Sequence, residues 1–208
     1  MTQTESDAPA LQCLGWEEGW DPNARQLPSP NQGVRPSMMQ PDLIVIHSIS
    51  LPPGVYGGPE VLQFFTNCLD FQSHPYFEQI AGLKVSAHFF IRRTGELWQF
   101  VDCAARAWHA GVSCYRGRSN CNDNSIGIEL EGLEGDAFTS PQYATLAELC
   151  QRLMQRYPIA HLAGHQHIAP GRKGDPGDGF DWHRLQLALQ LSDQYFPLAS
   201  ERLGPLLG

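Results

Sequence analysis

Short apolar runs separated by turn residues indicate the strands of this chain. Residues 42–47 form a β-branched run that suits a buried strand. Residues 86–91 and 96–101 are two further apolar runs, and the Arg-Arg-Thr-Gly segment between them predicts a hairpin. A fourth run at 159–163 predicts another short strand.

The stretch 125–131 predicts a strand of a different kind. Apolar side chains alternate here with Gly127, Glu129 and Glu131. Strict alternation is typical of a strand with one face against the core and one polar face, so we expect half-buried surroundings for the two glutamates.

Helical spacing of apolar residues marks the remaining elements. It predicts helices over 59–70 and 141–156, and a last helix that Asp181 caps and that runs to about residue 196. The Pro/Gly-rich tract 51–58 and the polar segment 108–124 are expected to be loops. Strands interleaved with helices predict an α/β fold with a central mixed β-sheet flanked by helices.

The chain length and the distribution of proline divide the sequence into three parts. With 208 residues, one folded domain is the simplest expectation. Residues 1–40 read as an irregular N-terminal arm packed on the body, residues 41–196 as the domain itself, and residues 197–208 as a C-terminal tail.

Charge and cysteine content limit the kinds of binding partner and the cellular compartment that we expect for this protein. The formal net charge of −8 argues against a nucleic-acid binder, which needs a basic face, and no apolar run is long enough for a membrane span. The opening residues lack the features of a secretory signal, and the six cysteines show no framework spacing. We therefore expect a cytoplasmic protein with free thiols and no obligate protein partner. Cys114 and Cys121 could still bridge a short loop.

The segment 164–177 carries the candidate chemistry. It brings His165, His167 and Asp175 together in a stretch too rich in Gly and Pro for a helix. Imidazole and carboxylate are the ligands that a catalytic zinc ion prefers, and such an ion usually takes three protein ligands. His47, at the end of the first buried strand, is the best candidate from elsewhere in the chain. The spacing alone does not choose between the two histidines of the segment.

Hydrolysis at such a site needs further groups. A water molecule bound at an open metal position loses its proton more readily, and a nearby carboxylate can carry that proton to the leaving group. Glu129 and Glu131 are both candidates for this role, and the ammonium group of Lys173 could stabilise an oxyanion. The plainer alternative is that these side chains are solvated surface charges.

Five motifs follow one another along the chain in a fixed order. They are His-x-Ile-Ser-Leu-Pro-Pro-Gly (47–54), Ser-Ala-His-Phe (86–89), Trp-His-Ala-Gly (108–111), Asn-Asp-x-Ser-Ile-Gly-Ile-Glu-Leu-Glu-Gly (122–132) and Gly-His-x-x-Ile-Ala-Pro-Gly-Arg-Lys-x-Asp-Pro-Gly (164–177). Together they resemble a known family, the zinc-dependent N-acetylmuramoyl-L-alanine amidases of type 2, and within it they look most like the cytosolic branch that acts on 1,6-anhydro-N-acetylmuramyl-L-alanine. The resemblance runs from about residue 15 to residue 190.

The resemblance implies a fold, a cofactor and an activity. The fold would be the mixed sheet that these amidases share with peptidoglycan recognition proteins. The activity would be hydrolysis of the amide bond between (1,6-anhydro-)N-acetylmuramic acid and the L-alanine of a small muropeptide, in peptidoglycan recycling, with an indirect effect on β-lactamase induction. Matched motif by motif, Zn²⁺ would be held by His47, His165 and Asp175, Glu129 would transfer the proton and Lys173 would assist the transition state.

Some positions depart from the family pattern or lie outside it. Ser48 stands where relatives usually carry Asn, which could alter a substrate contact, and His167 is a competing imidazole. Trp108 and His109 are interpreted as cleft wall or core, and His88 as packed. The substrate-binding residues remain unknown.

Two rival functions remain. A murein amidase acting on polymeric cell wall is disfavoured by the absence of a signal peptide, and a non-catalytic peptidoglycan-binding module is disfavoured by the complete ligand set.

Overall fold

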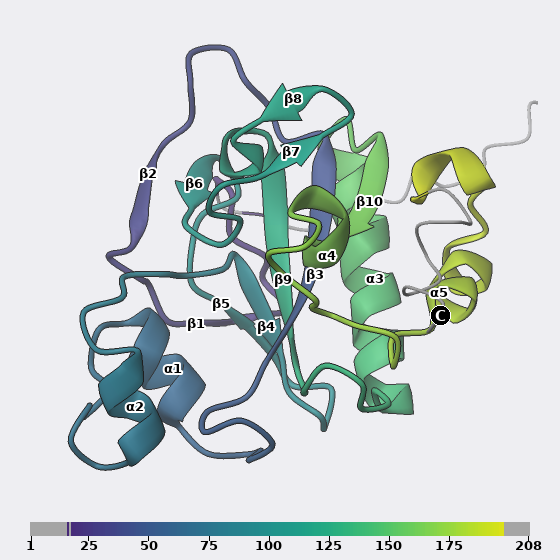
Figure 1. Ribbon diagram of the computed structural model, residues 1–208. Coiled ribbons are helices and arrows are strands. Elements are labelled where there is room, and N and C mark those ends of the chain that lie inside the picture. Colours follow the sequence, from purple (N-terminus) through teal and green to yellow (C-terminus); the bar gives the residue numbers. More distant parts are fainter. Residues whose placement is uncertain (1–15, 17, 198–208) are drawn as a thin grey trace, which may run out of the picture.

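A mixed β-sheet of six strands forms the centre of the protein (Figure 1). The computed structural model describes residue 16 and residues 18–197, so nearly all of the expected C-terminal tail lies outside the described residues. The strand order is β1-β5-β4-β9-β3-β10, and β4 and β5 are the antiparallel pair expected from the hairpin. The strands of this sheet are β1 (Arg25–Gln26), β3 (Leu43–Ile49), β4 (Phe89–Ile91), β5 (Leu97–Gln99), β9 (Ser125–Glu131) and β10 (His161–Gly164).

Helices cover both faces of the sheet, which confirms the predicted fold class. Figure 1 shows α3 behind the sheet with α5 beside it, and α1 and α2 against the other face near β4 and β5. The one-turn helix α4 lies close to β3 and β10. The helices are α1 (Glu60–Phe65), α2 (Pro75–Gln79), α3 (Ser140–Arg156), α4 (His165–Ile168) and α5 (Trp182–Leu189), with short 3-10 turns η1 (Cys121–Asp123) and η2 (Asp193–Tyr195).

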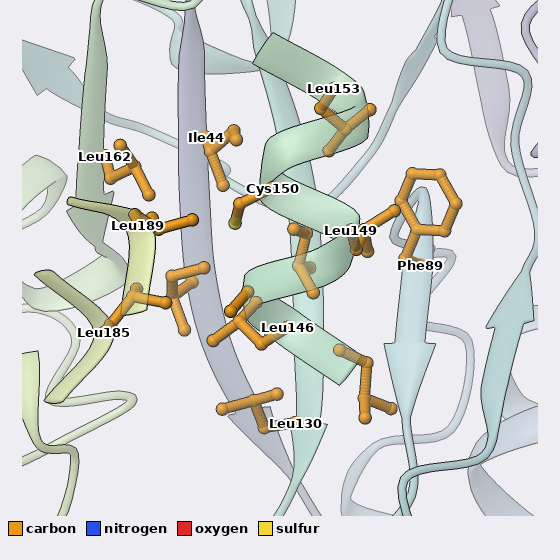
Figure 2. Close-up of a cluster of buried hydrophobic side chains, with 14 of the residues drawn as sticks. Ile44, Phe89, Leu130, Leu146, Leu149, Cys150, Leu153, Leu162, Leu185 and Leu189 are labelled. Carbon is orange, nitrogen blue, oxygen red and sulfur yellow. The ribbon is translucent and has the colours of Figure 1, made fainter. Parts of the chain in front are cut away.

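The main core lies between the sheet and α3. Residues Leu146, Leu149, Cys150 and Leu153 follow one another at helical spacing and are fully buried. Figure 2 shows them directed toward apolar side chains of the strands and of α5, including Ile44. Because side chains alternate between the two faces of a strand, the polar side chains between these apolar ones lie on the opposite face of the sheet.

Strand β9 is more deeply buried than its alternating pattern predicts. Every residue from Ser125 to Glu131 is buried, including Glu129 and Glu131. The alternative that these two glutamates are solvated surface charges is therefore wrong. The strand lies between β3 and β4 in the middle of the sheet, and the loops on its polar side cover it.

Several elements are shorter than their patterns predict. The helix expected over 59–70 ends at Phe65, since Asn67 adopts a positive φ of 60° that reverses the chain. The last helix ends at Leu189, where Gln190 takes the left-handed conformation. The segment 164–177 was expected to contain no helix, yet its first residues form α4.

Short strands also occur where irregular chain was expected. The arm 1–40 contains β1 and β2 (Gln32–Val34), and the segment 108–124 contains the hairpin of β7 (Cys114–Tyr115) and β8 (Arg118–Ser119). Strand β6 (Ala105–Ala107) pairs with β2. The cysteines in the described range, Cys114 and Cys121 among them, are free thiols. In that range no helix has the length and apolar character needed to cross a membrane.

His88 is packed, as expected, and its neighbour is the buried Arg35. The guanidinium donates to the backbone carbonyls of Cys103, Asn122, Asp123 and Ser125, which joins the arm to the body. The ring of His88 accepts a hydrogen bond from the Gly127 N–H at Nδ1. Burial, with the positive charge of Arg35 next, holds the pKa of His88 well below its usual value of 6.5.

This shift predicts an acid-sensitive fold. Below about pH 6.5 His88 binds a proton in the unfolded chain but not in the folded chain. The free energy of unfolding is therefore highest above that pH and decreases as the pH is lowered. Each such group contributes a slope of about 1.4 kcal/mol per pH unit. His88→Asn, which retains an acceptor for the Gly127 N–H, is expected to remove that contribution in urea unfolding of the metal-free protein between pH 5 and 7. An unchanged slope would contradict the assignment.

Candidate metal centre

The three predicted metal ligands meet at the ends of two parallel strands. His47 lies near the end of β3, and His165 follows β10, whose Gly164 pairs with Ile46. Asp175 comes from the loop beyond α4. The Nδ1 atoms of the two histidines are 3.0 Å apart, and the Asp175 Oδ2 lies 3.1 Å from each of them. All three side chains are buried.

The donor atoms fit a metal ion. The Nε2 atom of His165 lies 3.1 Å from the carbonyl oxygen of Ala110, which can only accept, and 3.4 Å from the Arg172 guanidinium, which donates to that same carbonyl. The shorter contact places the proton on Nε2 and leaves Nδ1 with a free lone pair. That lone pair faces the carboxylate of Asp175 and the Nδ1 of His47. Ligands at about 2.0–2.2 Å from a tetrahedral ion stand roughly 3.3 Å from one another, close to the observed separations. A cation relieves the repulsion among such atoms.

Burial also sets the charge of these groups. Desolvation, reinforced by the neighbouring His165, lowers the pKa of His47 to about 4, so the ring is neutral near pH 7 as a metal ligand must be. The site therefore combines two imidazoles, one of them held neutral by burial, with one carboxylate.

Glu129 lies beside these three residues. It pairs with His47 in the register of β9 with β3, and its Oε1 is 4.0 Å from the His47 Nδ1. Its Oε2 atom is buried and has no hydrogen-bond partner within the described part of the chain. Burial, followed by the negative charge of Asp175, raises the pKa of Glu129 well above its usual value. Such a carboxyl group can hold a proton and release it to a neighbour.

Glu131 has a different environment, two residues further along the same strand. Its carboxylate accepts hydrogen bonds from the Gly57 N–H at 2.6 Å and from the Arg93 N–H at 2.9 Å, and it pairs with the guanidinium of Arg92 at 3.3 Å. These contacts join the loop at 51–58 to the β4–β5 hairpin. Because both of its oxygens are engaged, Glu131 is a structural anchor rather than a free acid or base.

A cleft of about 630 Å³ opens over the site. His47, Glu129, His165 and Asp175 line it together with the exposed Lys173. A largely apolar part of its lining comes from α1, α2 and the chain that follows, with Phe64, Tyr76, Ile80, Leu83 and Val85. The cleft thus offers an ammonium group and an apolar surface to a ligand that reaches the candidate metal centre.

The two positions that depart from the family pattern lie differently. His167 turns away from the site: its Nδ1 accepts the Gly164 N–H at 2.8 Å and its ring packs edge-on against Trp182. Ser48 lines the cleft, and its buried hydroxyl has no hydrogen-bond partner among the described residues. His167 is therefore directed away from the three ligand atoms, whereas Ser48 lies on the cleft wall with its hydroxyl buried.

Sequence reasoning missed the hydrogen-bonding role of His109. It interpreted this residue as cleft wall or core, and the structure places the His109 Nδ1 2.9 Å from the His47 Nε2. The Trp-His-Ala-Gly motif was the available signal, but only the fold shows which side chain it meets.

Comparison with known proteins identifies the family. The model of the N-acetylmuramoyl-L-alanine amidase family matches residues 37–178. The 1,6-anhydro-N-acetylmuramyl-L-alanine amidase AmpD of Citrobacter freundii is 52% identical over 172 residues, covering 82% of this chain and 92% of that protein.

Two solved structures of amidases resemble the structure of this chain. A crystal structure of an AmpD selenomethionine derivative is 52% identical and superposes with a TM-score of 0.82, covering 85% of this chain and 99% of that chain. The amidase AmiD of Escherichia coli, solved with anhydro-N-acetylmuramic acid-L-Ala-D-γ-Glu-L-Lys, is 28% identical with a TM-score of 0.52, covering 74% of this chain and 60% of that chain. This chain is a member of the N-acetylmuramoyl-L-alanine amidase family.

Proposed function

We propose that this protein is a zinc-dependent amidase of peptidoglycan recycling. It cleaves the amide bond between the lactyl group of 1,6-anhydro-N-acetylmuramic acid and the L-alanine of the stem peptide. The names of the relatives support the substrate, since the AmpD proteins carry this activity in their name and AmiD was solved with such an anhydromuropeptide. The observation that carries the chemistry is the set of three buried ligand atoms 3.0–3.1 Å apart, beside a carboxyl group with a raised pKa.

His47, His165 and Asp175 would hold the zinc ion. Two neutral imidazoles and one carboxylate are a common catalytic zinc set, which leaves a coordination position for water or substrate. When bound, zinc supplies Lewis acidity and lowers the pKa of a coordinated water molecule. The tautomer of His165 and the burial of all three side chains support this assignment.

Glu129 and Lys173 would carry the remaining steps. Glu129 takes the proton of the attacking water and passes it to the amide nitrogen as the C–N bond breaks, so that the alanine leaves as a neutral amine. Lys173 stabilises the negative charge that develops on the carbonyl oxygen. The raised pKa of Glu129 and the position of Lys173 on the wall of the cleft support these roles.

The location and cellular role belong to the same proposal. We assign the reaction to the cytoplasm, where it would recycle wall fragments and so indirectly restrain β-lactamase induction. Fractionation of cells that produce the full chain tests the location, and recovery of the activity outside the cytoplasm would contradict it.

Product analysis tests the activity. The zinc-loaded protein is expected to convert anhydro-N-acetylmuramic acid-L-Ala-D-γ-Glu-L-Lys into the free anhydro sugar and a peptide with an N-terminal alanine. Intact sacculi, assayed in parallel, distinguish a murein amidase, which would release peptide from both substrates. Binding of the muropeptide without cleavage, at one zinc per chain, would instead indicate a peptidoglycan-binding module.

A further inference from the structure

A chain of hydrogen bonds extends from His47 away from the candidate metal centre. The His47 Nε2 lies 2.9 Å from the Nδ1 of His109. The Nε2 of His109 lies 3.1 Å from the hydroxyl of Ser125, and that hydroxyl donates to the Cys121 carbonyl at 2.5 Å. No step of the proposed reaction uses His109 or Ser125.

The carbonyl group of Cys121 at the end of this series of hydrogen bonds fixes which atom donates at each step. The carbonyl oxygen of Cys121 can only accept, so the single hydroxyl proton of Ser125 is directed to it. The hydroxyl then offers a lone pair to His109, whose Nε2 must carry the proton. This leaves the Nδ1 of His109 unprotonated.

The same logic extends to the proposed ligand. An unprotonated Nδ1 on His109 accepts from the His47 Nε2, which therefore carries the proton. The Nδ1 of His47 is then left with a free lone pair, directed at Asp175 and His165. This is the form that a metal ion requires.

Strand β9 makes room for the ring. Ser125, Gly127 and Glu129 alternate along one face of the strand, the face that carries the site. A Cβ atom at Gly127 would lie 2.5 Å from the His109 ring, so a side chain there would displace it. The glycine lets the imidazole lie against the strand between its partner Ser125 and the acid Glu129.

The residue after His109 provides the matching contact for the second imidazole. The carbonyl of Ala110 accepts from the His165 Nε2 at 3.1 Å. The side chain of Asn122 accepts the backbone N–H groups of both His109 and Ala110, at 3.1 and 2.8 Å, and so holds this dipeptide in place. Residues 109 and 110 thus contact the Nε2 atom of both proposed histidine ligands, His47 and His165.

We propose that His109 and Ser125 are positioning residues that set the tautomer of His47, with Ala110 doing the same for His165. This inference rests on the proposed metal-binding role of the two histidines. Groups that orient a ligand typically change metal affinity by 10- to 100-fold when they are removed.

Zinc titration of the full-length, metal-free protein against a chromophoric chelator tests the inference. Ser125→Ala and His109→Ala are each expected to weaken zinc binding by about 10- to 100-fold. The double variant is expected to bind no more weakly than His109→Ala alone, because Ser125 acts only through His109. Equal affinity in the single variants and the unmodified protein would overturn the inference.

Ser113→Ala is the matched control. This buried hydroxyl donates to the Gly111 carbonyl and accepts the Cys121 N–H, so it stabilises the same loop without reaching a histidine. Its zinc affinity is expected to equal that of the unmodified protein. A loss as large as that of Ser125→Ala would show a general effect of the loop and would also overturn the inference.

Nuclear magnetic resonance of the unmodified protein provides a readout that needs no variant. Long-range ¹H–¹⁵N spectra of the zinc-loaded protein are expected to show His109 protonated at Nε2 and unprotonated at Nδ1; the reverse tautomer contradicts the inference. The two proposals fail differently: an unmodified protein that binds no zinc refutes the metal centre, whereas tight zinc binding that is insensitive to both variants refutes only the positioning role.

Discussion

Glu129→Gln is expected to lower the rate of amide hydrolysis by about 10²- to 10⁴-fold while zinc stays bound at one ion per chain. Glutamine retains the volume of the side chain but cannot accept and return a proton. The Nδ1 atom of His47 is 4.0 Å from the nearest Glu129 oxygen, and Glu129 is not one of the three proposed ligands, so the metal should be unaffected. Steady-state kinetics on an anhydromuropeptide and metal analysis of the same preparation measure both effects.

Glu134→Gln is the matched control for this experiment. Glu134 lines the same cleft, but its side chain is exposed and it is not part of the candidate metal centre. We expect turnover close to that of the unmodified protein. Normal turnover by Glu129→Gln would contradict the proposed acid–base role of Glu129 and would mean that another group in the cleft carries the proton.

Asp175→Asn is expected to abolish both zinc binding and hydrolysis. The substitution keeps the shape of the side chain but removes the only acidic group among the three ligand groups, which are otherwise two imidazoles. Because the remaining donors are uncharged and buried, they hold a divalent cation far more weakly. Metal analysis after dialysis and the amidase assay, with and without added zinc, measure the two losses.

The same loop contains a matched control. Asp178 lies three residues further on and is exposed, so Asp178→Asn removes an equal charge without touching the three ligand groups. It is expected to retain zinc and activity. One zinc ion per chain in Asp175→Asn would contradict the proposed ligand set, whatever its activity.

Periodicity in the sequence was sufficient to predict the longer elements. The apolar stripe of α3, the β4–β5 hairpin and the buried run of β3 all occur close to their predicted positions. These patterns are local, and each reports which face of one element is covered. The ends of α1 and α5 were harder to predict, because they depend on a single residue, Asn67 or Gln190, that takes a left-handed conformation.

The sequence also named the residues that the fold brings together. His47, His165 and Asp175 were selected as ligand types and by resemblance. The parallel pairing of β3 with β10 brings the two histidines together, and the loop after α4 adds Asp175, so that the three ligand atoms lie within 3.1 Å of one another. Spacing alone left His165 and His167 equivalent. The structure separates them, since His167 turns toward Gly164 and Trp182.

What the sequence by itself determined is the order of the elements, the family and the kinds of side chain available for chemistry. Only the tertiary structure decided that Glu129 is buried with one oxygen that has no hydrogen-bond partner among residues 16 and 18–197, while both oxygens of Glu131 accept hydrogen bonds. It also decided that His109 connects His47 to Ser125. The physical reason is that burial and hydrogen-bond direction depend on neighbours far away in the chain. An alternating sequence pattern is the same for a strand at the edge of a sheet and for one in its centre. The tautomer of a histidine ligand depends on which hydrogen-bond acceptor the fold places next to the ring nitrogen that does not bind the metal.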